Sequence, residues 1–247
     1  MIVNASALKI PVRTYEAKLI YCDPPRNMGM NEHNSDDKLD PFEYEEFTIQ
    51  WIKEAYRCMR VEGWLVICTW HCQRYFFEHL LRTNYPYLEY DHEIIWDYNF
   101  GLYTHDRFVP SHDNILVFKR GHPQFHWQSV AVRSQRQDAG DTRADYRGRT
   151  PSSVWPIPRV PGNSKARSFM TDTHRRTCQP LELCTRVVKA FTDPNDLVLD
   201  LFSGAGTMGL ATRTAERQYF GLDICEHYCK EARRRLDLEH ERLFIKG

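Results

Sequence analysis

The chain has 247 residues, 42% of them hydrophobic and 13% aromatic, which is enough to bury the core of one large α/β domain and argues against disorder. Its formal net charge is zero, so net charge alone does not indicate a polyanionic partner. No apolar run is long enough to span a membrane, and the first eleven residues lack a signal-peptide cleavage pattern, so no membrane partner is expected.

The eight cysteines are scattered over predicted strands and helices, and none forms a Cys-x-x-Cys pair. This spacing predicts free thiols in a reducing compartment and no structural metal.

The first strong strand signal covers residues 18–22, which run directly into Asp-Pro-Pro-Arg-Asn-Met-Gly at 23–29. Proline cannot continue a hydrogen-bonded ladder, so the strand should end near Asp23 and present its carboxylate at the edge of a sheet. Proline also fixes φ and stiffens the turn that carries the carbonyls of Asp23 and Pro24. Taken alone, such a turn favours an ordinary strand ending.

The middle of the chain alternates between helix and strand signals. Residues 31–40 are polar and predict a loop, and apolar residues at i+4 spacing predict a helix over 44–59. A buried strand over 64–69 and a helix through Leu81 follow, and then two strands over 90–97 and 114–118.

The periodicity is lost between residues 121 and 153, where the sequence is rich in Arg and Gln. We interpret this segment as an insertion rather than a second core. From Arg133 to Arg176 there are ten basic and four acidic residues, a local charge of +6 that fits phosphate contacts on a nucleic acid, although a solvated loop is the alternative.

The last third of the chain predicts a helix from residue 179 to about 191, a strand over 197–200, a helix over 208–217, a strand over 219–224 and a helix over 226–241. Asp-Leu-Phe-Ser-Gly-Ala-Gly-Thr at 200–207 links the first of these strands to its helix. Gly204 and Gly206 can adopt positive φ and allow backbone N–H groups to approach a ligand.

Gly204, Gly206 and Gly209 satisfy Gly-x-Gly-x-x-Gly, so a dinucleotide site and an oxidoreductase activity are an alternative. Asp200 argues against it, because its carboxylate would repel a pyrophosphate but could hold an ammonium group. Asp223, near the end of the next strand, could accept hydrogen bonds from ribose hydroxyls. No Gly-Lys-Ser/Thr follows, which disfavours a P-loop.

Taken together, the motifs resemble those of the beta-group amino methyltransferases, which modify DNA with S-adenosylmethionine. Residues 23–29 resemble the family's Asp-Pro-Pro-Tyr-Asn-x-Gly, and residues 200–207 resemble its Asp-Pro-Phe-x-Gly-Ser-Gly-Thr. His-Asp-Asn-Ile-Leu-Val-Phe at 112–118, Val-Trp-Pro-Ile-Pro at 154–158 and Thr-Cys-Gln-Pro-Leu-Glu-Leu at 177–183 are similar to further family segments. The catalytic motif precedes the cofactor motif, which is the permuted order of this group.

The resemblance implies a Rossmann-like α/β methyltransferase fold with a mostly parallel sheet and helices on both faces. It implies a catalytic half at 1–120, an inserted target-recognition segment at 121–153 and an S-adenosylmethionine-binding half at 154–247. The implied activity is methylation of the N6 amine of adenine in DNA, of the kind found in restriction-modification, by a cytoplasmic or nucleoid-associated enzyme. Cytosine N4 methylation and a catalytically silent DNA-binding subunit are the alternatives. The recognition segment is short, so the protein reads few bases or shares the task within a homodimer.

The resemblance also assigns residues to roles. The catalytic residues are Asp23, Pro24, Pro25 and Arg26. The cofactor residues are Cys22, Thr177, Asp200, Phe202, Ser203, Gly204, Gly206, Thr207, Asp223 and Ile224. The basic pattern adds DNA contacts at Arg133, Arg136, Arg143, Arg147, Arg149, Lys165 and Arg167.

Two departures from the family pattern concern the chemistry. Arg26 replaces the aromatic residue that stacks on the extruded base; a guanidinium plane can also stack, but it adds charge beside a sulfonium. The family's Thr-Gln-Lys-Pro becomes Thr-Cys-Gln-Pro at 177–180, which removes a lysine.

Overall fold

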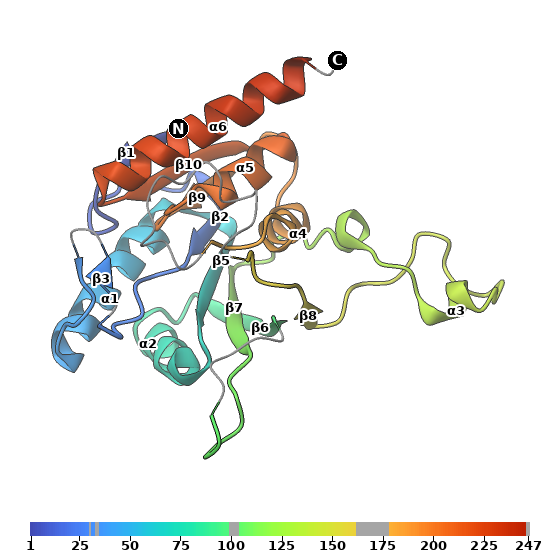
Figure 1. Ribbon diagram of the computed structural model, residues 1–247, viewed down its shortest axis with the longest axis horizontal. Helices are drawn as coiled ribbons and strands as arrows, with labels where there is room; N and C mark the ends of the chain where they lie inside the picture. The colour runs from blue at the N-terminus through green and yellow to red at the C-terminus, as the bar shows by residue number, and fades with distance from the viewer. Residues whose placement is uncertain (30, 33–34, 99–103, 162–177, 246–247) are drawn as a thin grey trace.

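The strands form one eight-stranded sheet in the order β1-β10-β9-β2-β5-β7-β6-β8 (Figure 1). The computed structural model describes residues 1–29, 31–32, 35–98, 104–161 and 178–245. Every neighbouring pair is parallel except those made by β7, which runs antiparallel to both β5 and β6. The mostly parallel sheet confirms the predicted fold. The strands are β1 Ile2–Asn4, β2 Ala17–Cys22, β5 Met59–Trp70, β6 Glu89–Asp97, β7 His112–Arg120, β8 Val154–Pro156, β9 Leu197–Asp200 and β10 Gln218–Asp223.

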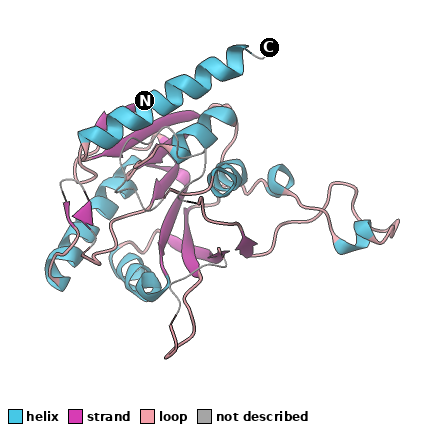
Figure 2. Cartoon of the chain, viewed as in Figure 1, coloured by secondary structure: helices cyan, strands magenta, loops and turns pink. Residues whose placement is uncertain are grey.

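Helices cover both faces of this sheet (Figure 2). The helices α4, α5 and α6 pack on one face, and α1 and α2 pack on the other. All six residues of β2 are buried, and from Leu19 to Cys22 successive side chains alternate between the two hydrophobic clusters, as expected for a central strand covered on both sides. The helices are α1 Pro41–Cys58, α2 Arg74–Asn84, α4 Leu181–Phe191, α5 Thr207–Thr214 and α6 Glu226–Ile245, with short turns at η1 His71–Gln73, η2 Trp127–Val130 and α3 Gln135–Asp138.

Three local features differ from the sequence prediction. The N-terminal strand β1 was not predicted, because three residues are too short to show a period, but it pairs with β10 along the sheet edge. The helix predicted to reach residue 217 ends at Thr214, and Glu216 adopts a φ of 62° that a helix cannot contain. Part of the loop predicted at 31–40 forms a short antiparallel ribbon, β3 Asn31–Glu32 with β4 Ser35–Asp36.

The segment after β7 leaves the body of the molecule as an arm with α3 at its tip (Figure 1). A β-bridge between Val132 and Arg149 joins its two legs, and a Ser134–Gln137 capping box closes the short helix α3. No residue of the arm between 131 and 150 is buried, so it lacks a core of its own. This agrees with an insertion, and the boundaries at 121 and 153 remain a prediction.

Candidate active site

The carboxyl ends of β2 and β9 lie side by side at one edge of the sheet, the position at which a ligand-binding crevice is expected in a sheet of this type. The two strands are parallel neighbours, and Tyr21 lies opposite Asp200 in their register. The chain leaves β2 through α1 on one face and β9 through α5 on the other, toward opposite sides of the sheet. Such a switch point is where open α/β sheets bind ligands. The two acidic strand ends therefore lie side by side, although they are far apart in the sequence.

Asp23 stands at this edge with its carboxylate held by an amide. Gln179 Nε2 donates to Asp23 Oδ2 at 2.9 Å, and Gln179 Oε1 accepts from the Tyr21 hydroxyl at 2.6 Å. The Asp23 side chain is 29% exposed, yet protein atoms surround it closely enough that desolvation raises its pKa to about 6, against the opposing effect of Arg26. Asp23 therefore titrates close to neutral pH, which suits a proton acceptor.

Hydrogen bonds to the carbonyls of Pro25 and Arg26 fix the Pro-Pro turn. The Tyr44 hydroxyl donates to the Pro25 carbonyl at 2.8 Å, and Gln73 Nε2 donates to the Arg26 carbonyl at 2.7 Å. Within the described part of the chain, no group donates to the Pro24 carbonyl. The Asp23 carboxylate and the Pro24 carbonyl, consecutive in this turn, are therefore two acceptors with capacity left for a ligand.

The rest of the turn is tied to the segment before α1. Asn27 has a φ of 53°, and the buried Asp37 carboxylate accepts the backbone N–H groups of Asn27 and Met28 at 2.6 and 3.1 Å. The Asn27 side chain donates to and accepts from the backbone of Leu39. These bonds restrain a conformation that a non-glycine residue rarely adopts.

Arg26 is engaged by a buried carboxylate. Its guanidinium forms a two-pronged contact with Asp113 at 2.8 and 3.4 Å and lies 4.0 Å from Asp23. Arg159 lies 3.9 Å from the same Asp113 carboxylate, and its guanidinium sits 3.6 Å from the centre of the Tyr98 ring. The stacking role considered for Arg26 stays a prediction, since its guanidinium is here oriented by Asp113.

The glycine turn after β9 is built on two carboxylates. Asp200 is 2% exposed and accepts from the Tyr219 hydroxyl at 2.9 Å; burial raises the pKa of Asp200 to about 7, opposed by this hydrogen bond. Asp223 accepts the N–H of Gly204 at 2.9 Å and that of Cys225 at 2.9 Å. Gly204 and Gly206 have φ values of 44° and 73°, and a Cβ on Gly206 would lie 3.0 Å from the Cβ of Ala232. Glycine is therefore needed here on conformational grounds.

Other predicted cofactor residues differ in how far their side chains are free to contact a ligand. The Ser203 hydroxyl is buried without a hydrogen-bond partner among the described residues, so a ligand could satisfy it. Thr207 Oγ1 accepts from the buried Arg235 at 2.8 Å, and Arg235 also donates to the Ala205 carbonyl at 3.0 Å. Phe202 is half-buried against the edge of Trp51, with ring centres 5.6 Å apart.

Three more of the predicted cofactor residues lie in different surroundings. The Cys22 side chain is fully buried in the same cluster as Ile20 and Leu199, because this β2 position faces the core, so its predicted cofactor contact stays a prediction that concerns the backbone. Ile224 is 53% exposed at the end of β10. Thr177 lies outside the described residues.

Several site residues were missed at the sequence level. Gln179 stands where the family has a lysine, and this departure was a signal that the position matters. Its partner could not be predicted, because Asp23 is 156 residues away in the sequence. Asp113 lies in the motif at 112–118 without having been assigned a role. Arg235 and Tyr219 carry no recognisable local signal, because a buried arginine and a buried tyrosine hydroxyl are identified only by their partners.

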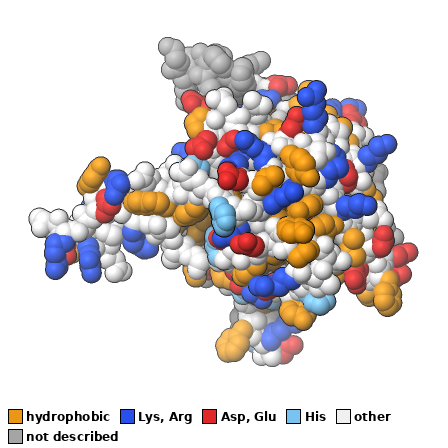
Figure 3. Space-filling view, turned by 180° about the vertical axis from the view of Figure 1, so that it is seen from behind, with side chains coloured by type: hydrophobic (Ala, Val, Ile, Leu, Met, Phe, Trp, Pro, Cys, Tyr) orange, Lys and Arg blue, Asp and Glu red, His pale blue; other side chains and the backbone are white. Residues whose placement is uncertain are grey.

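The predicted DNA-binding arginines of the arm lie on an exposed surface (Figure 3). Three of them form ion pairs with arm aspartates: Arg133 with Asp138 at 2.8 Å, Arg143 with Asp141 at 2.9 Å and Arg147 with Asp145 at 2.7 Å. The net charge of +6 predicted for 133–176 already counts these three aspartates, so the pairs leave the excess unchanged but engage three of the arginines within the arm. Arg136 and Arg149 have no carboxylate partner among the described residues, and Lys165 and Arg167 lie outside them.

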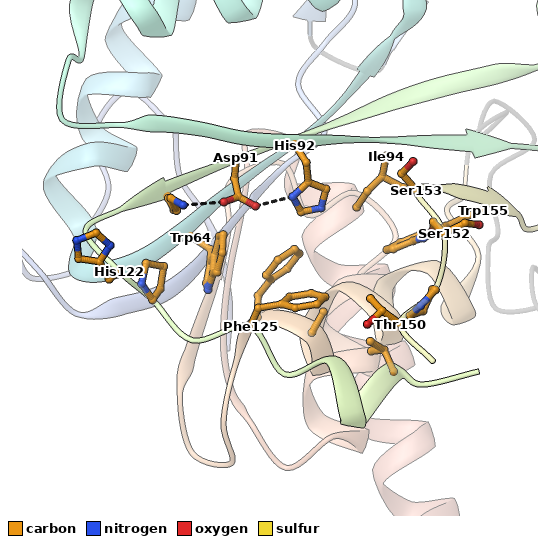
Figure 4. Close-up of a pocket in the computed structure, with 16 residues that line it drawn as sticks. Trp64, Asp91, His92, Ile94, His122, Phe125, Thr150, Ser152, Ser153 and Trp155 are labelled. Carbon is orange, nitrogen blue, oxygen red and sulfur yellow. Dashed lines mark hydrogen bonds and ion pairs between the residues drawn. The ribbon is translucent and has the colours of Figure 1, made fainter. Parts of the chain in front are cut away.

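A cavity of about 510 Å³ lies at the root of the arm, but it is not part of this crevice (Figure 4). Its walls include Trp64, His92 and Phe125. Trp64 is six residues before Trp70, which pairs with Asp113, so about 20 Å of strand separates the cavity from the Asp113 end of β5. The crevice, which unites the acceptors and the glycine turn, is the better candidate for chemistry.

Membrane-spanning helices and clustered metal ligands are both absent from the described ranges. No helix there has the length and apolar character required to cross a membrane, and no three potential metal ligands gather there. All eight cysteines are free thiols, as predicted.

Comparisons with known proteins relate the chain to DNA methylases. The family model N6_N4_Mtase, described as DNA methylase, matches residues 17–234. Type II methyltransferase M.HpaI of Haemophilus parainfluenzae is 29% identical over 229 residues, covering 90% of this chain and 68% of that protein. DNA adenine methyltransferase YhdJ of Escherichia coli (strain K12) is 26% identical over 259 residues, covering 96% and 82%. The solved structure of PvuII DNA methyltransferase (cytosine-N4-specific) superposes with a TM-score of 0.71 at 15% identity, covering 94% of this chain and 84% of that one.

Proposed function

This chain belongs to the N6/N4 DNA methylase family, and on that premise we propose that it transfers the methyl group of S-adenosylmethionine to the N6 amine of adenine in DNA. The observation that carries the proposal is the pair of acceptors, the Asp23 carboxylate and the Pro24 carbonyl, beside the glycine turn of β9. An exocyclic amine carries two hydrogens, and two adjacent acceptors can hold both.

The residues of the crevice fit the proposed cofactor. Asp200 is a buried carboxylate without a cationic partner among the described residues, and it suits the ammonium of the methionine moiety. Each carboxylate oxygen of Asp223 accepts one backbone N–H and can also accept a ribose hydroxyl. The Ser203 hydroxyl and the N–H groups of the glycine turn supply further polar contacts. S-adenosylmethionine supplies an electrophilic methyl group when it is bound.

The chain's own residues contribute position and electrostatics. The lone pair of the adenine amine is delocalised into the ring, so the nitrogen is a poor nucleophile. Hydrogen bonds from the amine to Asp23 and Pro24 favour a pyramidal nitrogen whose lone pair points out of the base plane. Stacked neighbours block that direction in a duplex, so the base must first be extruded into the crevice. Asp23 accepts best when ionised, so activity should fall as the pH drops through about 6.

The choice of adenine over cytosine rests on Asp23, since by family resemblance cytosine N4 enzymes usually carry serine at this position. Cytosine N4 methylation is the alternative with the same geometry. A catalytically silent DNA-binding subunit is a further alternative, favoured by the commitment of Arg26 to Asp113. We also propose the division into a catalytic half (1–120), a recognition segment (121–153) and a cofactor half (154–247), with Arg136 and Arg149 as the arm's available phosphate contacts.

The decisive experiment is mass spectrometry of nucleosides from DNA incubated with the protein and labelled cofactor. Labelled N6-methyladenine is expected, and labelled N4-methylcytosine would contradict the choice of base. Asp23→Ala should abolish methylation while calorimetry still detects cofactor binding. Asp91→Ala, which removes a carboxylate at the cavity on the other sheet edge, is the matched control and should stay active. Undiminished methylation by Asp23→Ala would refute the assigned role, and absence of cofactor binding by the wild type would favour the silent subunit.

A further inference from the structure

Asp113 is a buried carboxylate with no role in the proposed methyl transfer. It lies near the start of β7 opposite Trp70 of β5 and is 1% exposed. It contacts Arg26 at 2.8 Å, the Tyr98 hydroxyl at 3.4 Å and Arg159 at 3.9 Å. Burial of a carboxylate is costly unless cations and hydrogen bonds offset it, so this cluster has a defined arrangement rather than an incidental one.

Arg26 lies between two carboxylates that compete for it. Its Nη2 atom is 2.8 Å from Asp113 Oδ2 but 4.0 Å from Asp23 Oδ1. The first distance is a charge-assisted hydrogen bond, and the second is too long for one. Because Arg26 and Asp23 belong to the same short turn, a small rotation of the arginine side chain would bring the guanidinium onto Asp23. Asp113 is the group that opposes this rotation.

Resting on the proposed function, we propose that Asp113 is a positioning residue that holds the Arg26 guanidinium away from Asp23 and so keeps the Asp23 carboxylate open to the substrate amine. This role of Asp113 is needed because arginine replaces the family's aromatic residue at position 26. An arginine in this turn would otherwise occupy the acceptor, and its positive charge would stand beside the proposed sulfonium. Asp113 removes both problems through one ion pair.

The neighbours of Asp23 allow the effect of removing Asp113 to be predicted. Charged groups face Asp23 from several elements: Arg26 in its own turn, Asp113 in β7, Arg159 after β8 and Asp200 in β9. The thiols of Cys68 in β5 and Cys184 in α4 lie nearby and are kept neutral by burial, which raises the pKa of each well above its ordinary value. Loss of the Asp113 charge and approach of Arg26 both favour the ionised form of Asp23.

The test is Asp113→Asn, which keeps the shape and retains an oxygen to accept from Tyr98. Its amide nitrogen would no longer hold Arg26, so the arginine should move to Asp23. We expect kcat/KM at pH 8 to fall about tenfold, because a charge-assisted hydrogen bond now competes with the substrate amine. The acidic limb of the pH profile should move down by about one pH unit. If Asp113 had a purely structural role, Asp113→Asn would lower kcat/KM at high pH without moving the acidic limb of the pH profile.

A double variant separates the proposal from misfolding. Arg26→Tyr combined with Asp113→Asn has no guanidinium to close on Asp23, so it should recover most of the activity lost in the single variant. A ¹³C titration of the aspartate carboxyls, with Asp23 assigned through Asp23→Asn, should show the same downward shift in Asp113→Asn without any need for turnover. An unmoved Asp23 titration, or a double variant no better than Asp113→Asn, would overturn the proposal. An inactive wild type with a shifted titration would refute the proposed function alone.

Discussion

Gln179 offers a direct test of how the crevice tunes Asp23. Gln179→Met keeps the length of the side chain but removes the amide that donates to Asp23 at 2.9 Å and accepts from Tyr21 at 2.6 Å. The lost hydrogen bond stabilised the ionised carboxylate, so the pKa of Asp23 should rise further above its present value of about 6. Hydrogen bonds to charged groups contribute about 1.5–3 kcal/mol, and solvent at this partly exposed site can replace part of that. The lower end corresponds to about one pKa unit.

This shift predicts a pH-dependent defect. At pH 6.5 the ionised fraction of Asp23 falls from about three quarters to about one quarter, so kcat/KM should drop roughly threefold. At pH 8.5 both proteins are fully ionised and should differ little. The assay is initial-rate methylation of a DNA substrate across this pH range, with cofactor affinity measured by calorimetry at each end.

Tyr21 supplies the matched control. Tyr21→Phe removes the hydroxyl that donates to Gln179 and leaves the amide on Asp23, so the acidic limb should stay in place. In Gln179→Met the buried Tyr21 hydroxyl loses its acceptor, which should cost about 1–3 kcal/mol of unfolding free energy. The double variant should regain that stability and keep the shifted limb. An unshifted limb in Gln179→Met, or an equal shift in Tyr21→Phe, would refute the reasoning.

Two further predictions concern the cofactor side and the arm. Asp200→Asn should abolish cofactor binding yet raise the free energy of unfolding, because burial raises the pKa of Asp200 to about 7 and its ionisation therefore costs stability as the pH rises from about 4 through 7. The gain should be larger at pH 8 than at pH 5 by roughly 3 kcal/mol, and an equal rise in melting temperature at both pH values would contradict the assignment. Arg136→Ser combined with Arg149→Ser should weaken DNA binding and reduce the slope of log K against log salt concentration by about 0.9 for each phosphate that the arm no longer neutralises. Arg143→Ser breaks an ion pair within the arm and should change this slope less. Filter-binding titrations at several salt concentrations measure both slopes, and equal slopes in the two proteins would contradict the prediction.

Local sequence signals specify most of the elements and the kind of chemistry. Apolar runs predicted β2 and β9, proline fixed the end of β2 at Asp23, and the glycines at 204 and 206 predicted positive φ, which the structure shows. Each signal is local, because a strand, its end and its turn depend on consecutive residues. The order of motifs is likewise readable from the chain alone, and it indicates the permuted family.

Which side chains meet depends on the order of the strands in the folded sheet. The bond from Gln179 to Asp23 and the ion pair from Arg26 to Asp113 join segments 156 and 87 residues apart, brought together by the order of β9, β2, β5 and β7 in the sheet. The direction of the Cys22 side chain also depends on the sheet. Alternation along β2 turns this side chain into the core, although the neighbouring Asp23 lies at the crevice. Partner choice and side-chain direction depend on neighbouring strands, and that information is not local to any stretch of the chain.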